Sequence, residues 1–259
     1  MSDRIDGARA FGGLDRLYGA GALARASGAH VAVVGIGGVG SWAAEALARS
    51  GVGRIALVDF DHIAESNLNR QVHALDVTLG QAKVVAMAQR IAAINPDCRV
   101  QQIEQFATPD NLDAVFASAP HIVIDACDGV QAKTAIVQWC RTHGVAVICC
   151  GAAGGKTDAT KIRCEDLAHT QYDPLLAKVR ARLRKFHAYP RDPRKRFGVE
   201  AVFSCEAIQK PAHGLVCDAE PGSALNCHGY GSIVTVTATF GLIAAGRALH
   251  IALARAQPA

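Results

Sequence analysis

The sequence has few of the features that would assign it to a membrane, secreted or fibrous protein. Charged residues make up 19% of its 259 positions and aromatic residues 5%, and no internal repeat or low-complexity tract is present. Residues 1–29 contain no apolar core of a signal peptide. The longest apolar run, within residues 232–254, spans about 14 residues, fewer than the roughly 20 of a membrane-spanning helix. Since half of the residues are apolar, we expect a globular cytoplasmic protein without a transmembrane segment, with at most a weak membrane association through that run.

Cysteine is present, but never as a Cys-x-x-Cys pair. The nine cysteines are Cys98, Cys127, Cys140, Cys149, Cys150, Cys164, Cys205, Cys217 and Cys227. An odd number of thiols is expected in a reducing compartment, where disulfides are rare. Without paired Cys-x-x-Cys sequences, the chain lacks the usual ligands of a structural zinc site.

A nucleotide-binding pattern begins with a strand and a glycine-rich turn. The apolar run His30–Val34 predicts a buried parallel strand, and residues 41–50 have the apolar spacing of a helix. Between them, the G-x-G-x-x-G spacing is formed by Gly35, Gly37 and Gly40, with Gly38 inside it. Glycines allow the backbone to approach a phosphate, and the N–H groups at the start of the helix point towards it. The alternative is that the glycines serve only the close packing of helix and sheet.

The residues after the second strand indicate which nucleotide is bound. The strand Arg54–Val58 ends on Asp59, an acid placed to accept the hydroxyls of a ribose. Polar and charged residues follow it at Asp61, Asn67, Arg70, Gln71 and Lys83. A dehydrogenase gains nothing from cations beside the phosphates, whereas attack on an α-phosphate develops negative charge there. We therefore expect all six residues to bind ATP for adenylation, with Asn67, Arg70 and Lys83 catalytic; the alternative is an ordinary turn with a solvated arginine.

Apolar periodicity beyond this region predicts further helices and strands in alternation. Helices are expected at residues 81–94 and 130–143, and strands at residues 99–103, 121–125, 145–150 and 199–207. This alternation predicts a Rossmann-like α/β fold, in which a doubly wound, mostly parallel sheet has helices on both faces and a C-terminal strand and helix extend it. A helix within residues 1–29 should lead into the first strand, and residues 232–254 should form a buried or dimer-packing helix.

Asp128 and a loop of small residues follow two of these strands. Asp128 lies just past the strand at 121–125, at the carboxyl edge of the sheet, where ligands bind in such folds. Its carboxylate there would bind Mg²⁺ beside the nucleotide, or alternatively cap the helix at 130–143. Residues 151–155, Gly-Ala-Ala-Gly-Gly, either leave room for a substrate or form a tight turn.

A basic segment occupies residues 178–196, although the net charge of the whole chain is only +4. Its cations include Lys178, Arg180, Arg182, Arg184, Lys185, Arg194, Lys195 and Arg196. The aromatic or imidazole rings of His187, Tyr189 and Phe197 lie among or beside them. Charge at this density suits a phosphate backbone, and such rings can stack on bases. The segment is therefore predicted to bind nucleic acid, unless it is a solvated, flexible insertion.

Several longer motifs resemble those of one enzyme family. They include Phe11-Gly12-Gly13, VVGIGGVGSWAAEALARSG, NRQVHAL, INPDCRV, GAAGGKTDATKI, DPLLAKVRARL, VFSCEA and TVTATFG. Through them, nearly the whole chain resembles the ThiF/MoeB/HesA family, related to ubiquitin-activating enzymes, and within it the tRNA threonylcarbamoyladenosine dehydratases. The resemblance implies a single ThiF-type adenylation domain, with a nucleotide-binding core at residues 1–165, a basic tRNA-binding insertion and loop at 166–231, and a packing helix at 232–259.

The resemblance also implies ligands, partners and a reaction. ATP and Mg²⁺ would be bound, with a monovalent cation as a further candidate. The partners would be tRNA, a second copy of the chain in a homodimer, and a cysteine-desulfurase sulfur-acceptor system. The carboxylate of threonylcarbamoyladenosine would be adenylated, and ring closure would then expel AMP and give the cyclic nucleoside. Arg16, or else Arg9, would reach an ATP phosphate, often from the other subunit, and Cys227 would lie near the active site unless it is merely structural.

Two other functions remain open from the sequence. One is adenylation of the C-terminus of a ubiquitin-like sulfur-carrier protein. Members with that activity often carry paired Cys-x-x-Cys zinc sites, which this chain lacks. The other is a nucleotide-sensing binding module, whose basic segment docks on RNA and which releases no AMP.

Overall fold

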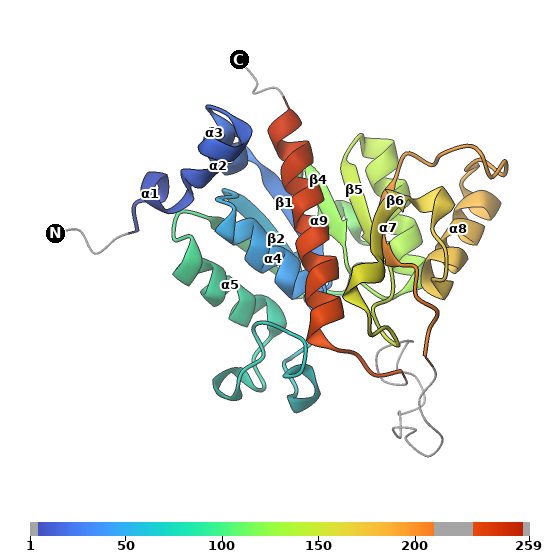
Figure 1. Cartoon of the computed structure of the whole chain (residues 1–259), viewed down its shortest axis with the longest axis horizontal. Helices are drawn as coiled ribbons and strands as arrows, with labels where there is room; N and C mark the ends of the chain where they lie inside the picture. The colour runs from blue at the N-terminus through green and yellow to red at the C-terminus, as the bar shows by residue number, and fades with distance from the viewer. Residues whose placement is uncertain (1–4, 210–229, 256–259) are drawn as a thin grey trace.

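The structure, a computed structural model, describes residues 5–209 and 230–255. Its centre is a seven-stranded sheet with the strand order β3-β2-β1-β4-β5-β7-β6 (Figure 1). The strands are β1 His30–Val34, β2 Arg54–Val58, β3 Arg99–Ile103, β4 Ile122–Asp125, β5 Ala146–Cys150, β6 Ile162–Asp166 and β7 Glu200–Ser204. All neighbouring strands are parallel except β6 and β7. The prediction of a mostly parallel Rossmann-like sheet is confirmed.

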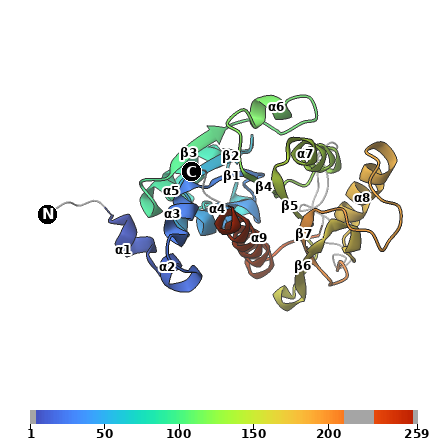
Figure 2. The ribbon, with the colours of Figure 1, turned by 90° about the horizontal axis from the view of Figure 1, so that it is seen from above.

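Helices cover both faces of this sheet (Figure 2). The α-helices are α1 Gly7–Phe11, α2 Gly13–Tyr18, α3 Ala22–Gly28, α4 Gly40–Arg49, α5 Lys83–Ile94, α6 Leu112–Val115, α7 Val130–His143, α8 Pro174–Phe186 and α9 Val234–Ala254. Short 3₁₀ helices are η1 Glu65–Asn67, η2 Asp76–Thr78, η3 Ala159–Lys161 and η4 Leu167–His169. Helices α4, α5 and α9 pack on one face, and α6 and α7 on the other, with α8 beside α7.

The alternation of side chains along β1 supplies both cores. Val31 and Val33 join the core beneath α4 and α9, whereas Ala32 and Val34 join the core beneath α6 and α7. All of β1 is buried because successive side chains point to opposite faces and both faces are covered. A continuous apolar run is therefore the correct signature of this strand.

Element bounds follow the predictions to within three residues, as for the strand predicted at 199–207 and found as β7 Glu200–Ser204, and two larger differences occur. The strands at 30–34, 54–58 and 99–103 and the helix at 130–143 have the predicted bounds. The edge strand β6 was not predicted separately, because it buries only Ile162 and carries charged residues. The single helix expected before β1 is three short helices, since Gly19 and Gly21 adopt φ angles of 89° and 80° that interrupt it.

Helix α9 is the C-terminal packing helix that the sequence predicted. It crosses α4 so closely that a Cβ at Gly241 would lie 2.4 Å from the carbonyl oxygen of Val39. By length and composition alone its 21 residues could cross a membrane, although half of its most apolar window is buried in the protein. Packing against α4 and the sheet accounts for the buried half of this apolar helix.

Candidate active site

The glycine turn after β1 has the close backbone approaches that require glycine. Gly35 has a φ angle of 85°, and a Cβ there would lie 2.8 Å from the carbonyl oxygen of Ala126. A Cβ at Gly40 would lie 1.8 Å from the carbonyl oxygen of Gly35. A Cβ at Gly37 would instead have no neighbour closer than 4.0 Å among the described residues. Gly35 and Gly40 therefore form the turn, and Gly37 leaves its outer side open for a ligand.

Helix α4 begins at this turn without a side-chain cap. Its N-cap residue, Val39, makes no side-chain hydrogen bond to the first turn. Uncapped N–H groups at a helix start favour an anion, because they carry partial positive charge and need acceptors. This end of α4 fits a phosphate group.

Asp59 ties the turn to the end of β2. Its Oδ2 accepts the N–H of Ile36 at 2.6 Å, and its Oδ1 accepts the N–H of Asp61 at 2.8 Å. Burial raises the pKa of Asp59, although Lys83 and these hydrogen bonds act to lower it. Each oxygen still has a lone pair for a ribose hydroxyl, so Asp59 can both position the turn and bind a nucleotide.

Lys83 and Asp61 form an ion pair beside the turn. Lys83 is the first residue of α5, and its Nζ lies 2.7 Å from Asp61 Oδ2. The lysine side chain is 8% exposed and the carboxylate 53% exposed. The ammonium group therefore lies at the bottom of the site, with an accessible acid in front of it.

Arg70 lies against the turn but hydrogen-bonds elsewhere. Its Nη1 donates to the carbonyl oxygen of Ser66 at 2.6 Å and to Asn69 Oδ1 at 2.8 Å. Its aliphatic stem would be 3.2 Å from a Cβ at Gly38. The indole of Trp42 donates to the Arg70 carbonyl oxygen at 2.9 Å. Trp42 was not predicted as a site residue, because a tryptophan in a helix is normally read as part of the core.

Asn67 and Gln71 complete the polar segment. Asn67 is buried, and its Oδ1 accepts the N–H of Ala64 at 3.1 Å, which holds η1 in place. Gln71 is 5% exposed, and its buried Oε1 is without a hydrogen-bond partner among the residues that the structure describes. The Gln71 side chain faces Gly37. The atom nearest Gly37 is the amide Nε2, a donor that suits an acceptor such as a phosphate oxygen at the open part of the turn.

Asp128 is exposed at the carboxyl edge of the sheet, as predicted. It does not cap α7, whose N-cap is Gly129 and makes no side-chain bond. Partial burial raises the pKa of the Asp128 carboxyl, an effect that Asp61 reinforces and that Lys133 and Lys83 oppose. Asp61 and Lys83 follow β2, and Asp128 follows β4, so all three lie on the carboxyl side of the same parallel sheet. Since Mg²⁺ is commonly bound by one or two carboxylates together with substrate phosphates, Asp128 with Asp61 fits that ion.

A buried ion pair lies directly beneath Asp128. Lys133 Nζ lies 3.0 Å from Asp125 Oδ1, and neither side chain is exposed. The same ammonium donates to the carbonyl oxygens of Asp125 at 3.2 Å and Cys127 at 2.9 Å. Burial acts to lower the pKa of Lys133, but the Asp125 carboxylate outweighs it and the pKa is raised. Lys133 thus fixes the loop that carries Asp128, a role that the sequence pattern did not indicate.

The basic segment divides into free and engaged cations. Helix α8 lies alongside α7 (Figure 1). The exposed members are Lys178, Lys185, Arg194, Lys195 and Arg196, although Arg194 pairs with Asp192 at 3.2 Å, and the half-buried members are Arg180, Arg182 and Arg184. Arg184 donates to the carbonyl oxygen of Pro190 at 3.1 Å and lies over the ring of Phe197. The expectation that Tyr189 and Phe197 are available for base stacking is wrong, because both rings are buried in the core beneath α8.

Arg16 lies at the edge of the sheet opposite the glycine turn. Its helix, α2, is joined to α3 by a hydrogen bond from the Leu23 N–H to Asp15 Oδ1, and α3 leads into the amino end of β1. The whole length of β1, five residues or roughly 16 Å, separates the end of α3 from the glycine turn. Arg9, in α1, is at the same edge. Either arginine would meet a bound nucleotide only in a second copy of the chain; Cys227 lies outside the described residues.

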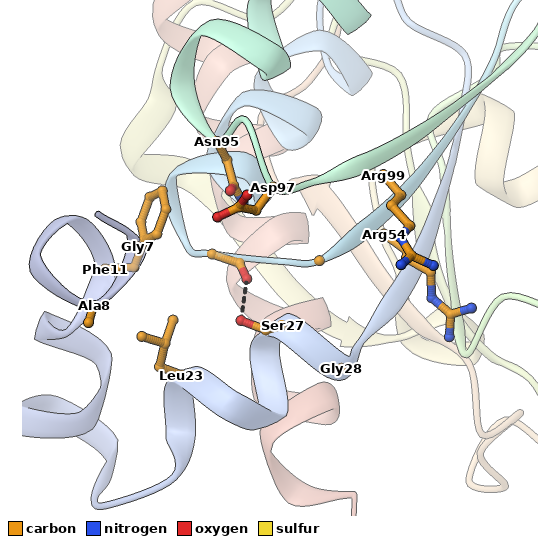
Figure 3. Close-up of a pocket in the computed structure, with 12 residues that line it drawn as sticks. Gly7, Ala8, Phe11, Leu23, Ser27, Gly28, Arg54, Asn95, Asp97 and Arg99 are labelled. Carbon is orange, nitrogen blue, oxygen red and sulfur yellow. Dashed lines mark hydrogen bonds between the residues drawn. The ribbon is translucent and has the colours of Figure 1, made fainter. Parts of the chain in front are cut away.

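A pocket of about 500 Å³ is also found at this opposite edge (Figure 3). Phe11 and Leu23 line it from the N-terminal helices, and Arg54 and Arg99 line it from the starts of β2 and β3. It shares no residue with the glycine turn or with the polar segment after β2. The pocket therefore does not belong to the candidate active site, which is an open surface at the carboxyl edge.

The chain is similar to known proteins over nearly its whole length. The ThiF family matches residues 13–259. The chain is 46% identical to the tRNA threonylcarbamoyladenosine dehydratase of Escherichia coli (strain K12), over 95% of this chain and 94% of that protein. It is 42% identical to the protein of that name from Haemophilus influenzae, over 92% and 91%. A crystal structure of the E. coli tRNA N6-threonylcarbamoyladenosine dehydratase in complex with ATP is similar, with a TM-score of 0.85, 44% identity and 95% of each chain covered.

Proposed function

Because this chain belongs to the ThiF family, we propose that it is an ATP-dependent tRNA threonylcarbamoyladenosine dehydratase, which closes threonylcarbamoyladenosine in tRNA to its cyclic form. The observation that supports the proposal is the position of Asp59, Arg70 and Lys83 beside the glycine turn, with Asp128 on the same carboxyl side of the sheet. This arrangement joins a ribose acceptor, an anion-binding helix start and two cations at a single edge of the sheet. It suits adenylation better than hydride transfer, which has no use for the cations.

The reaction that we propose consists of activation and closure. The threonine carboxylate of the modified nucleoside attacks the α-phosphate of ATP, forming an acyl-adenylate and releasing pyrophosphate. Attack from within the same side chain then expels AMP and closes the ring, with net loss of one water. Activation is needed because hydroxide is a poor leaving group, and the closure is fast because both reacting groups belong to one molecule.

The residues of the turn and the polar segment would divide this work. Asp59 would accept the ribose hydroxyls, and the N–H groups at the start of α4 would bind phosphate oxygens. Arg70 and Lys83 would stabilise the negative charge that develops on the α-phosphate, with Asn67 and Gln71 completing the polar lining. Asp128 would bind Mg²⁺, which when present neutralises phosphate charge and orients the leaving pyrophosphate. Lys83 would have to exchange Asp61 for the phosphate.

The substrate tRNA would lie along α8. This helix has 13 residues, about 20 Å at 1.5 Å per residue, and begins at the carboxyl edge of the sheet beside the candidate active site. The exposed cations of the basic segment would bind phosphates of the stem while the modified nucleoside reaches the site. The half-buried Arg184, which is engaged with Pro190 and Phe197, would mainly hold the segment in shape.

A homodimer would complete the site. Arg16 lies at the far edge of its own chain, so it would contact the nucleotide of a second copy. The cysteine-desulfurase system and the monovalent cation stay predictions of the family resemblance.

The test is direct. The protein is incubated with ATP, Mg²⁺ and threonylcarbamoylated tRNA, and the nucleosides are analysed by mass spectrometry. The expected product is a nucleoside lighter by one water, formed with AMP and pyrophosphate. ATP binding without AMP release under any RNA would favour a binding module instead. ATP–pyrophosphate exchange triggered by a small carrier protein and not by tRNA would favour sulfur-carrier activation.

A further inference from the structure

Tyr172 has an unusual backbone conformation that its own side chain does not explain. Its φ angle is 53°, in the left-handed region that bulky residues avoid. Its ring is 61% exposed, so burial of the ring does not offset the strain. Strained residues of this kind persist only where the surroundings fix them, and they gather at binding sites.

Two buried charged residues fix Tyr172 from both sides. Lys156 is 2% exposed, and its Nζ donates to the Tyr172 carbonyl oxygen at 3.0 Å and to the carbonyl oxygen of Glu206. The next residue, Asp173, is also buried and accepts the N–H of Ala152 at 2.9 Å and that of Leu176 at 2.9 Å. These bonds hold the strained peptide while the ring stays in solvent.

The ring borders an open pocket of about 360 Å³. The pocket is lined by Tyr172, Asp173, Pro174, Ala177, Arg180, Ala207 and Ile208. It thus combines an aromatic face, an apolar floor and one guanidinium group. Lys178, exposed on the same helix, adds positive charge nearby. An aromatic ring beside cations is the chemistry that binds unpaired nucleotides, in which a flat base carries a phosphate.

The pocket is connected to the candidate active site through the small-residue loop after β5. Ala152, which donates to Asp173, is the second residue past β5, and β5 lies next to β4, whose end carries Asp128. Both places therefore lie at the carboxyl edge of one sheet. A nucleotide bound at Tyr172 would be close to a nucleoside reacting beside Asp128.

We propose that Tyr172 is a stacking platform for an unpaired base of the tRNA substrate, next to the reacting nucleoside, and that Arg180 and Lys178 bind the phosphate beside that base. The proposal rests on the proposed function and adds a base-binding site to it. Lys156 is then a positioning residue, which holds the platform in its strained conformation. Of the rings predicted to stack on bases within the basic segment, Tyr189 and Phe197 are buried, and in this proposal Tyr172, just before α8, provides an exposed ring instead.

The first test distinguishes the contribution of the Tyr172 ring from that of its backbone conformation. Tyr172→Asn removes the ring, and asparagine tolerates a positive φ, so the melting temperature should be unchanged or higher. Tyr172→Phe keeps the ring and is the matched control. We expect Tyr172→Asn to raise the KM for modified tRNA about tenfold or more, with kcat at saturating tRNA and the KM for ATP unchanged. Tyr172→Phe should resemble the wild type, and an unchanged KM for tRNA in Tyr172→Asn would overturn the proposal.

The second test measures stacking without turnover. An anticodon stem–loop carries 2-aminopurine at the unpaired position flanking the reacting nucleoside, and its fluorescence is followed during titration with protein. Wild type and Tyr172→Phe should quench the fluorescence, and Tyr172→Asn should not; equal quenching by all three would refute the platform. Quenching by a wild-type protein that shows no dehydration would leave the platform intact and reject the proposed reaction. Tyr172-dependent binding of an acidic peptide, without binding of the stem–loop, would assign the pocket to a protein partner instead.

Discussion

Lys83 and Asp61 face one another across the candidate active site, with Nζ 2.7 Å from Oδ2. The lysine is buried and the aspartate is accessible, so an incoming phosphate meets the carboxylate before it meets the ammonium group. A phosphate carries more negative charge than a carboxylate, and it can displace Asp61 as the partner of Lys83. Asp61 would then turn towards the bound cation near Asp128.

Replacing Lys83 should therefore slow adenylation itself. We expect Lys83→Gln to lower the rate of AMP formation about 10²- to 10³-fold at saturating ATP and tRNA, because an uncharged amide stabilises the transition state poorly. Lys161→Gln is the control, since Lys161 is 53% exposed and pairs with Asp158 on the surface. A near-normal rate for Lys83→Gln would remove this residue from the chemistry.

The two inner glycines should give different kinetic defects. In Gly38→Ala the new methyl group would be 3.2 Å from the stem of Arg70, tight enough to displace that side chain and to lower kcat about tenfold or more. In Gly37→Ala the methyl group enters open space, where it would obstruct the nucleotide and raise the KM for ATP. Steady-state kinetics with varied ATP distinguish the two results. The same defect in both variants would contradict the assigned roles.

Removing one partner of the buried Lys133–Asp125 pair should be costly. Lys133→Met leaves the Asp125 carboxylate buried without its counter-ion, and we expect a loss of about 3–5 kcal/mol in the free energy of unfolding. The double variant Lys133→Met, Asp125→Leu removes both charges and should lose less than the single variant. Urea denaturation measures both. If the double variant is the less stable one, the pair is not held by its mutual charge.

His73 should make the protein less stable in mild acid. Burial, followed by the charges of Lys83 and Arg90, lowers the pKa of His73 from 6.5 to about 4, and neither ring nitrogen has a hydrogen-bond partner among the described residues. In the unfolded chain His73 becomes protonated below about pH 6.5, whereas in the folded protein it stays neutral until about pH 4. The free energy of unfolding therefore falls as the pH is lowered from 6.5 to 4. The shift corresponds to about 3 kcal/mol.

A leucine at this position tests the effect. His73→Leu fills a similar space without a titratable group, and its free energy of unfolding should decline less between pH 6.5 and 4 than that of the wild type. His30 and His121, whose pKa values burial also lowers, and Glu206, whose pKa hydrogen bonds from Asp158 and Thr157 lower to about 2 despite desolvation, are unchanged in this variant and contribute to the remaining decline. Parallel curves for both proteins would show that His73 does not cause the acid sensitivity.

Neighbouring cations on α8 should differ in their effect on tRNA binding. Lys185 is exposed, so Lys185→Gln should weaken binding at low salt and reduce the slope of log affinity against log salt by about one, without changing the melting temperature. Arg184 is engaged with Pro190 and Phe197, so Arg184→Gln should lower the melting temperature instead. Filter binding at several salt concentrations, with thermal unfolding of the same variants, makes the comparison. A salt slope that is unchanged in Lys185→Gln would exclude Lys185 as a phosphate contact.

The turn and its surroundings were predictable because local rules dictate them. The glycines at 35 and 40 are required by backbone approaches of a few ångströms, which leave a spacing in the sequence. The buried strands β1 and β2 leave continuous apolar runs, since both faces of the sheet are covered. Arg70, Lys83 and Asp128 could each be predicted as site residues, because Arg70 and Asp128 follow predicted strands and Lys83 lies in the first turn of a predicted helix.

Contacts between side chains that are far apart in the sequence could not be predicted from any local sequence pattern. Lys133 and Lys156 look like ordinary lysines in the sequence, yet both are fully buried and hydrogen-bond to backbone carbonyl oxygens of other elements. Tyr189 and Phe197 looked available, but the fold of α8 against β5 and β7 buries them.

The sequence by itself determined the sheet, the glycine turn and the identity of the polar residues after β2, because apolar periodicity and glycine spacing are properties of a few consecutive positions. Only the tertiary structure decided which charges are paired, which arginines are free for RNA, and that Arg16 lies at the edge opposite its own turn. Burial and ion pairing depend on which helices and strands pack together in the tertiary structure, and the spacing of residues along the sequence does not specify those contacts.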